Sequence, residues 1–149
     1  MLAQDWMQEA INLSKSAEPA EVPIAALIVK DNQLLASAVN QKESRMDPTA
    51  HAEVLAIQRA CAKLQNWRLN DCDLYVTLEP CLMCAGAIIQ ARIRKLYFAA
   101  YDKKGGAVCS CTESFALPNI NHRPEWQGGI LQEQASQDLS QFFKNLRKS

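Results

Sequence analysis

Two short segments contain residue types that together could bind a metal ion and catalyse a hydrolysis. The first is His51-Ala52-Glu53, and the second is Pro80-Cys81-Leu82-Met83-Cys84, about thirty positions later. Cys81 and Cys84 are three residues apart, so one helical turn places both sulfurs on the same face, where a single ion can reach them. The partial positive charge at a helix N-terminus also favours the thiolate, which is the form that binds metal.

The donor set indicates a catalytic rather than a structural metal site. Two thiolates and one neutral imidazole give zinc three protein ligands and leave a fourth position open. We therefore predict one Zn2+ per chain, held by His51, Cys81 and Cys84, with Glu53 beside the ion. Zinc lowers the pKa of a coordinated water to about 7, and a carboxylate there can move its proton to a ring nitrogen and then to a departing amine. The pattern H-x-E followed by P-C-x-x-C is the signature of zinc deaminases.

The cysteines also allow other interpretations. A C-x-x-C pair occurs in redox proteins and as half of a structural zinc site, and Cys109-x-Cys111 could supply the second half. A structural site leaves the joint presence of His51 and Glu53 unexplained. A redox pair lacks the sequence context that usually accompanies it. The catalytic site is therefore the favoured interpretation.

Composition limits the class of protein. A chain of 149 residues with 48% hydrophobic content can bury its own core, so residues 1–149 are expected to form a single domain. Sixteen basic and sixteen acidic residues balance, which argues against nonspecific coating of nucleic acid. No apolar run approaches the roughly 18 residues of a membrane span, and the six cysteines suit metal or reduced thiols. We expect a cytoplasmic protein that does not bind membranes.

The elements that position the two motifs follow from hydrophobic periodicity. Helices are predicted at residues 5–17, 50–64, 81–91 and 136–146, and strands at 23–29, 34–39, 73–78, 95–100 and, more weakly marked, 130–131. Thr49 is the expected N-cap of the second helix. Both motifs then lie at the starts of helices. The alternation of helices and strands predicts an α/β fold, a three-layer α/β/α sandwich with a central mixed sheet covered on both faces.

Beyond the two motifs, the chain resembles the bacterial tRNA-specific adenosine deaminases of the cytidine deaminase superfamily. The resemblance extends over nearly the whole chain and includes Glu21-Val22-Pro23, residues 47–53, 74–81 and 83–87, Gly106-Ala107, Asn121-His122-Arg123 and Phe142-Phe143. It implies a cytidine-deaminase-like fold. It also implies a homodimer that converts the wobble adenosine of a tRNA anticodon loop to inosine.

The same resemblance assigns contacts with the substrate. Asn40 would hold the flipped base, the backbone around Ala52 would receive its edge, and Asp102 would touch a loop ribose. Asn121 and Phe143 would help to hold the splayed loop, with an aromatic ring as a stacking surface for unpaired bases. The two asparagines could instead satisfy turns, and a phenylalanine on an amphipathic terminal helix could instead belong to the core.

Two rival functions remain open at this level. The first is deamination of a free nucleobase or nucleoside of the guanine or cytosine type, because the same zinc and glutamate serve any of these rings. The second is a non-catalytic, zinc-containing RNA-binding module, against which the presence of Glu53 argues. The chain also departs from the family pattern at residues 108–111, where Val-Cys-Ser-Cys stands in place of the common glycine and serine.

Overall fold

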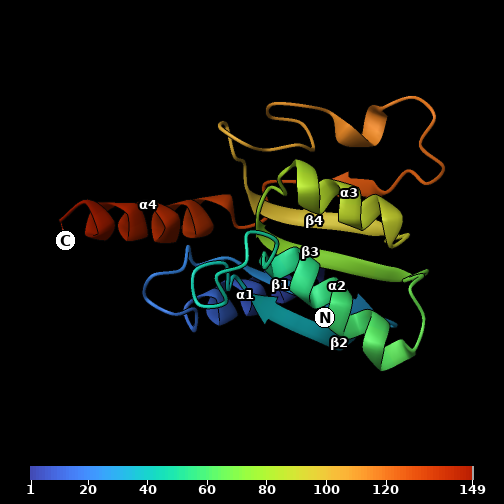
Figure 1. The fold of residues 1–149 in the computed structure, drawn as a ribbon, viewed down its shortest axis with the longest axis horizontal. Helices are drawn as coiled ribbons and strands as arrows, with labels where there is room; N and C mark the ends of the chain where they lie inside the picture. The colour runs from blue at the N-terminus through green and yellow to red at the C-terminus, as the bar shows by residue number, and fades with distance from the viewer. Residues whose placement is uncertain (149) are drawn as a thin grey trace.

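The computed structural model describes residues 1–148, which form one five-stranded sheet with helices on both faces (Figure 1). The elements in chain order are α1 (Ala3–Ser14), β1 (Ala25–Lys30), β2 (Gln33–Val39), α2 (Ala52–Leu64), β3 (Cys72–Leu78), α3 (Leu82–Gln90), β4 (Lys95–Ala100), the 3-10 turn η1 (Ser114–Ala116), β5 (Glu125–Gln127) and α4 (Gln132–Lys148). The strand order is β2-β1-β3-β4-β5. β1 is antiparallel to β2 and β3, whereas β3, β4 and β5 run parallel, so the sheet is mixed as predicted.

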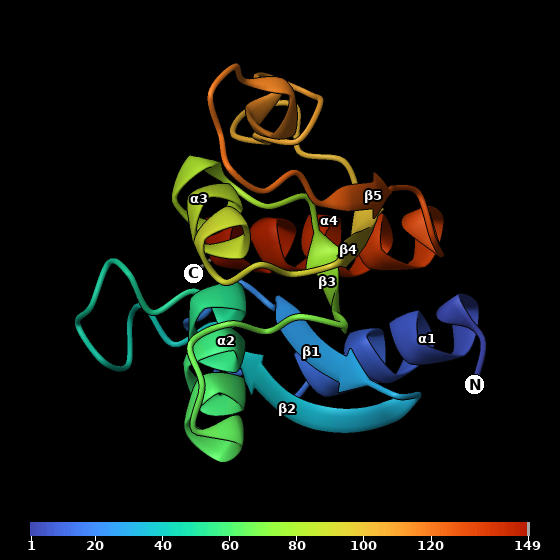
Figure 2. The ribbon, with the colours of Figure 1, turned by 90° about the vertical axis from the view of Figure 1, so that its right-hand side faces the viewer.

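Successive side chains of the central strands point to opposite faces of the sheet and build two separate cores. Ile28, Leu74 and Phe98 pack with α2 and α3, whereas Val29 and Tyr75 pack with α1 and the start of α4. Figure 2 shows α2 and α3 together on one side of the sheet, with α1 on the other. Because both faces are covered, the strands are apolar on both sides. The predicted three-layer sandwich is confirmed.

One edge of the sheet gathers segments that are far apart in the sequence. β3 and β4 are parallel, so their C-terminal ends lie at the same edge. β1 is antiparallel to β3 and therefore begins at this edge, and β2 ends there, with Val39 paired to Ala25. Asn40, Glu79 and Asp102, which directly or closely follow three of these strands, consequently emerge close to one another. The helices α2 and α3 also begin at this edge.

The expected N-cap of α2 is wrong. The helix begins at Ala52 with His51 as its N-cap, and Thr49 lies outside it. Asp47 accepts hydrogen bonds from both the backbone N–H and the hydroxyl of Thr49, at 2.8 and 2.7 Å. This local turn uses the hydroxyl that would have capped the helix. The helix consequently starts two residues later, within the His51-Ala52-Glu53 motif.

The expected strand at residues 130–131 is also wrong, because the last strand is β5 at Glu125–Gln127. All three side chains of β5 are exposed, and Trp126 is the only apolar one among them, so no alternating apolar pattern marks this strand in the sequence. It is held by backbone pairing with β4 and by stacking of the Trp126 ring on Phe98, with ring centroids 5.8 Å apart. Leu131 has a φ of 55° and leads directly into α4, which is incompatible with an extended strand.

The terminal helix α4 extends beyond the body of the sandwich, and the C-terminus lies at its far end (Figure 1). Its first turns are attached to α1 through reciprocal amide hydrogen bonds between Gln8 and Gln134, of 2.7 and 3.1 Å. Ala135 is its one buried residue, and Phe143 is 44% exposed. Within residues 1–148, no helix has the length and apolar character needed to cross a membrane.

Candidate metal centre and active-site pocket

The four motif residues lie at the first turns of two adjacent helices. His51 is the N-cap of α2, and Glu53 is the second residue of that helix. Cys81 is the N-cap of α3, and Cys84 is its third residue. Both cap residues have extended backbones, and their carbonyls accept the first helical hydrogen bonds, from Leu55 and Ala85. The side chains therefore leave the helix ends toward the same point at the edge of the sheet.

The distances among the three donor atoms fit a single tetrahedral metal ion. The Nδ1 atom of His51 lies 3.7 Å from the sulfur of Cys81 and 3.5 Å from that of Cys84. All three donor atoms lie within 4.8 Å of one another. Bonds of about 2.3 Å to sulfur and about 2.05 Å to nitrogen at a tetrahedral angle separate the two atoms by about 3.6 Å, which matches both distances.

The electrostatics of the cysteine pair also favour a metal. Hydrogen bonds from the Cys84 thiol and from the backbone N–H groups of Met83 and Cys84, together with the charge of His51, outweigh burial and lower the pKa of Cys81 to about 5. The pKa of Cys84 is raised, because its proton is donated to Cys81 and the side chain is buried. The two sulfurs thus share one proton. A divalent ion would replace this proton and stabilise both thiolates.

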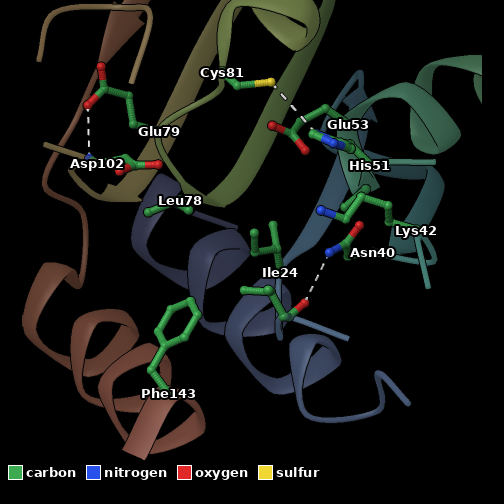
Figure 3. Close-up of a pocket in the computed structure, with 12 residues that line it drawn as sticks. Ile24, Asn40, Lys42, His51, Glu53, Leu78, Glu79, Cys81, Asp102 and Phe143 are labelled. Atoms are coloured by element: carbon green, nitrogen blue, oxygen red, sulfur yellow. Dashed lines mark hydrogen bonds between the residues drawn. The ribbon is translucent and has the colours of Figure 1, made fainter. Parts of the chain in front are cut away.

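Glu53 lies beside the metal-binding atoms with a carboxyl group suited to proton transfer. Its side chain is 4% exposed, and burial raises its pKa to about 7, with a smaller contribution from the Cys81 thiolate. A carboxyl group that titrates near neutrality can both accept and release a proton under physiological conditions. Figure 3 shows the side chains of Glu53, His51 and Cys81 directed toward one another.

These residues line a cavity of about 240 Å³ at the edge of the sheet (Figure 3). The lining residues come from every segment that reaches this edge: Val22, Ile24, Asn40, Lys42, His51, Ala52, Glu53, Leu78, Glu79, Cys81, Asp102 and Phe143. Ile24, Leu78 and Phe143 contribute apolar side chains to the lining, and Figure 3 shows His51, Glu53 and Cys81 grouped together at another part of it. The cavity can accommodate a small planar ring with its reacting edge at the metal site.

The cavity contains polar groups that could bind such a ring. The Oδ1 atom of Asn40 is buried and has no hydrogen-bond partner within the described residues, while its amide nitrogen lies 3.5 Å from the carbonyl of Val22. Ala52 is the first residue of α2, so its N–H has no acceptor within the helix. A buried polar atom without a partner is costly, which favours a hydrogen bond with a ligand. Two of the predicted substrate contacts therefore lie in the pocket.

Asp102 and Phe143 also line the pocket, Asp102 from the loop after β4 and Phe143 from α4. Asp102 follows β4, and its backbone N–H donates to Glu79 at 3.1 Å. Its side chain accepts hydrogen bonds from the backbones of Lys104 and Gly105. Phe143 extends from α4, where it stacks edge-on against Phe142. Both residues also line a second, larger cavity of about 920 Å³ next to the first.

The structure does not bring Asn121 into the pocket. Asn121 is exposed in the loop after η1 and accepts a hydrogen bond of 2.8 Å from the guanidinium of Arg92. It lines neither the cavity at the metal site nor the larger cavity next to it. Cys109 and Cys111 do not join a metal-binding group among residues 1–148, and the thiol of Cys111 donates to the carbonyl of Lys103 instead. This placement argues against the structural zinc alternative.

The sequence pattern alone did not identify Glu79 and Lys42 as pocket residues. Glu79 directly precedes Pro80-Cys81. Its position at the end of a strand and next to this motif could have indicated that it lies at the pocket. Hydrogen bonds from Cys109, Ser110 and Asp102 overcome the cost of burial and lower its pKa. Lys42 lies in an irregular loop, and its residue type carried no such signal.

Comparison with known proteins places this site in a family. The sequence matches the MafB19-like deaminase family over residues 1–147. It is 46% identical to a tRNA-specific adenosine deaminase of Aquifex aeolicus, over 97% of this chain and 95% of that protein. A solved structure from a study of tRNA:A34 deaminases superposes with a TM-score of 0.87 and 44% identity, over 90% of this chain and 98% of that chain. A guanine deaminase of Bacillus subtilis superposes with a TM-score of 0.66 and 33% identity, over 100% and 96%.

The α/β/α sandwich and the His-Cys-Cys group beside a buried glutamate define the chain as a deaminase. The 46% identity with the Aquifex aeolicus protein, over nearly the full length of both chains, decides which family of deaminases the chain belongs to. The chain belongs to the family of the tRNA-specific adenosine deaminases. The fold and the family expected from the sequence are both confirmed.

The geometry predicts that Cys84→Ser abolishes metal binding. The protein should contain one metal ion per chain by elemental analysis, and the variant should contain almost none and melt at a lower temperature, since metal binding contributes to folding. Cys111→Ser, at an exposed cysteine outside the site, is the matched control and should retain one ion. A full metal content in Cys84→Ser, or loss of metal in Cys111→Ser, would contradict the assigned ligands.

Proposed function

We propose that this protein hydrolytically deaminates adenosine to inosine at the wobble position of a tRNA anticodon loop. One zinc ion per chain, held by His51, Cys81 and Cys84, is the proposed cofactor. The family to which the chain belongs supports this proposal, as does the arrangement of the pocket. None of the six cysteines, all of which lie within the described residues, forms a disulfide, which suits a cytoplasmic enzyme acting on tRNA.

The chemistry divides between the metal and the protein. Zinc bound at this site supplies Lewis-acid activation of a water molecule for attack on the ring carbon that carries the amine. Glu53 would take one proton from the attacking water and deliver it to the adjacent ring nitrogen. It would then carry the second proton of that water to the amine, which would leave as ammonia while the oxygen stays on the ring carbon as the carbonyl. Its raised pKa and its place within the pocket suit both directions of transfer. Asn40 and the N–H of Ala52 hold the base edge.

The observation that carries the choice of substrate is the second cavity, of about 920 Å³. It shares Val22, Leu78, Asp102 and Phe143 with the metal pocket, so the two form a continuous groove. Four exposed cations line the second cavity: Lys103, Lys104, Lys144 and Arg147. A free base fills only the metal pocket. A polynucleotide strand places its base in the metal pocket and its flanking phosphates among these cations.

The contacts along the groove suit single-stranded RNA. Phe143 offers an exposed ring on which an unpaired base can stack. Asp102 lies at the junction of the two cavities, where its carboxylate can accept a hydrogen bond from a ribose 2′-hydroxyl, the group that distinguishes RNA from DNA. Asn121 lies outside the groove with Arg92, so its proposed contact would be with a part of the RNA beyond the flipped base.

The surface of α3 supports a homodimer. Leu82 is 65% exposed and Met83 is 37% exposed, both in the first turn of the helix beside the metal site. Gly86 lies one turn further along, with open space around it, so a second helix could approach closely. Exposed apolar side chains next to a close-approach residue are typical of a helix that packs against another chain. The proposed occupant of this face is a second copy of the same chain.

The test of the proposed function compares substrates side by side. An anticodon stem-loop with adenosine at the wobble position, free guanine and free cytidine are incubated separately with the zinc-loaded protein, and replacement of the amine by oxygen is followed by mass spectrometry. The stem-loop should be deaminated fastest, because it alone occupies both cavities. A stem-loop with inosine already at that position is the control. Comparable or faster deamination of guanine or cytidine would assign the chain to the free-base branch.

Glu53→Gln should abolish turnover without emptying the metal site. The amide keeps the size of the side chain but cannot take up a proton, and general acid–base catalysis contributes about a hundredfold or more. Zinc content and RNA binding should stay near those of the unmodified protein. Glu113→Gln, at an exposed glutamate, serves as the control. Turnover by Glu53→Gln within a fewfold of the unmodified rate would show that this carboxyl group is not the proton carrier.

Leu82→Glu should convert the dimer to a monomer, because a charge on α3 would be buried against the partner helix. Sedimentation velocity should give twice the chain mass for the unmodified protein and the chain mass for the variant. Leu34→Glu, at an exposed leucine of the edge strand β2, is the matched control and should stay dimeric. A monomer mass for the unmodified protein would refute the homodimer.

A further inference from the structure

The side chain of Glu79 is 2% exposed, although it is charged and lies directly between β3 and the metal-binding segment. Its carboxylate accepts five hydrogen bonds, all from residues 102–110. The donors are the backbone N–H groups of Asp102 at 3.1 Å, Val108 at 3.1 Å, Cys109 at 2.9 Å and Ser110 at 3.0 Å, together with the hydroxyl of Ser110. The loop that follows β4 is thus folded around one carboxylate.

The hydrogen bonds explain how the charge is tolerated. A buried carboxylate is costly unless polar groups surround it, and charge-assisted hydrogen bonds from backbone N–H groups are among the stronger ones. Three consecutive N–H groups, of residues 108–110, point at one oxygen of Glu79 and form a concave anion-binding nest. The anion in this nest is a side chain of the protein itself. The loop and the carboxylate therefore depend on each other.

A glycine in the same loop supports this dependence. A Cβ atom added at Gly106 would overlap the Glu79 carboxylate, so the backbone approaches the carboxylate more closely than any other residue type permits. The neighbouring Gly105 has no such constraint, since a Cβ there would lie 3.5 Å from Asp102. The N–H of Ala107 also donates to the carbonyl of Pro80 at 2.8 Å. The loop is thus held against the strand that leads to Cys81.

We propose that Glu79 is a positioning residue whose buried carboxylate fixes the loop of residues 102–110 against the metal-binding segment and so sets the place of Asp102 at the mouth of the pocket. Glu79 connects the two halves of the site, because Cys81 lies two residues after it and Asp102 donates directly to it. The metal position and the substrate-contacting loop are therefore fixed relative to each other by one side chain. Where this inference concerns RNA, it rests on the proposed function.

Three variants separate positioning from general support of the fold. Glu79→Gln keeps the shape of the side chain but replaces an acceptor oxygen with an NH2 group that faces N–H donors, which leaves buried donors unpaired. Gly106→Ala disturbs the same contact from the loop side without changing Glu79. Gly105→Ala is the matched control in the adjacent position. The first two variants should behave alike, and the third should resemble the unmodified protein.

Hydrogen exchange of the zinc-loaded protein tests the contact without any substrate. In Glu79→Gln and in Gly106→Ala, the amides of residues 108–110 should exchange at least about tenfold faster than in the unmodified protein, because their acceptor is lost or displaced. The amides of α2 should exchange at unchanged rates, and one zinc per chain should remain. Gly105→Ala should keep slow exchange throughout the loop.

Kinetics on the anticodon stem-loop test the consequence. Loss of the loop position should raise KM about tenfold in Glu79→Gln while kcat changes by less than about threefold, since the proton carrier and metal ligands are intact. A double-mutant cycle with Asp102→Ala then asks whether Glu79 acts through Asp102. In the Asp102→Ala background, Glu79→Gln should raise KM by less than about threefold, because the group that it positions is already absent.

The outcomes distinguish this inference from the proposed function. Faster loop exchange in both variants, in a protein that does not deaminate the stem-loop, would refute the proposed substrate and leave the positioning role established. Unchanged loop exchange in both variants would overturn the positioning role, and so would an equal rise in KM with and without Asp102. Loss of zinc from Glu79→Gln combined with unmodified behaviour of Gly106→Ala would also overturn it, because the carboxylate would then support the metal ligands alone.

Discussion

The packing of α2 beside α3 on one face of the sheet is the constraint on which the site depends. His51 comes from the start of one helix and the two cysteines from the start of the other, so the distances among the three candidate donor atoms exist only while the two helices keep their positions. Small side chains allow this arrangement: Ala52, Ala56 and Ala60 recur every four residues along α2 and are fully buried, and Ala85 of α3 belongs to the same core. Larger side chains at these alanine positions would push α2 away from its neighbours. The imidazole of His51 would then move away from the thiols of Cys81 and Cys84.

The mixed sheet supplies the second half of the site. Because β1 runs against β3 while β4 runs along it, the same edge receives the start of β1, the end of β2 and the ends of β3 and β4. Loops from these strand ends form the pocket wall, and two buried glutamates hold them. Glu21 accepts hydrogen bonds from the backbones of Glu43 and Ser44, and Glu79 holds the loop of residues 102–110 in the corresponding way.

The parts of the site that could be predicted from the sequence are those set by residues close together along the chain. The spacing of Cys81 and Cys84 and the positions of both motifs at helix starts required only the helical repeat, and they predicted three residues whose donor atoms the structure brings within 4.8 Å of one another. Long-range placement was not accessible in this way. Thr49 has the residue type of a helix cap, but its hydroxyl donates to Asp47 instead, and the one apolar side chain of β5, Trp126, is too little to form an alternating pattern. Asn121 pairs with Arg92, a contact between segments that no local pattern connects.

Three glutamates buried at this edge of the sheet differ in their pKa, and the difference assigns their roles. Glu21 and Glu79 accept several hydrogen bonds from backbone N–H groups, which outweigh burial and hold the pKa of each below its ordinary value. Both therefore remain anions at neutral pH and act as fixed acceptors. Glu53 is buried with fewer donors and beside the negative charge of Cys81, so its pKa rises to about 7. Among these three, Glu53 alone can exchange a proton near neutral pH, and it is the one that faces the metal-binding atoms.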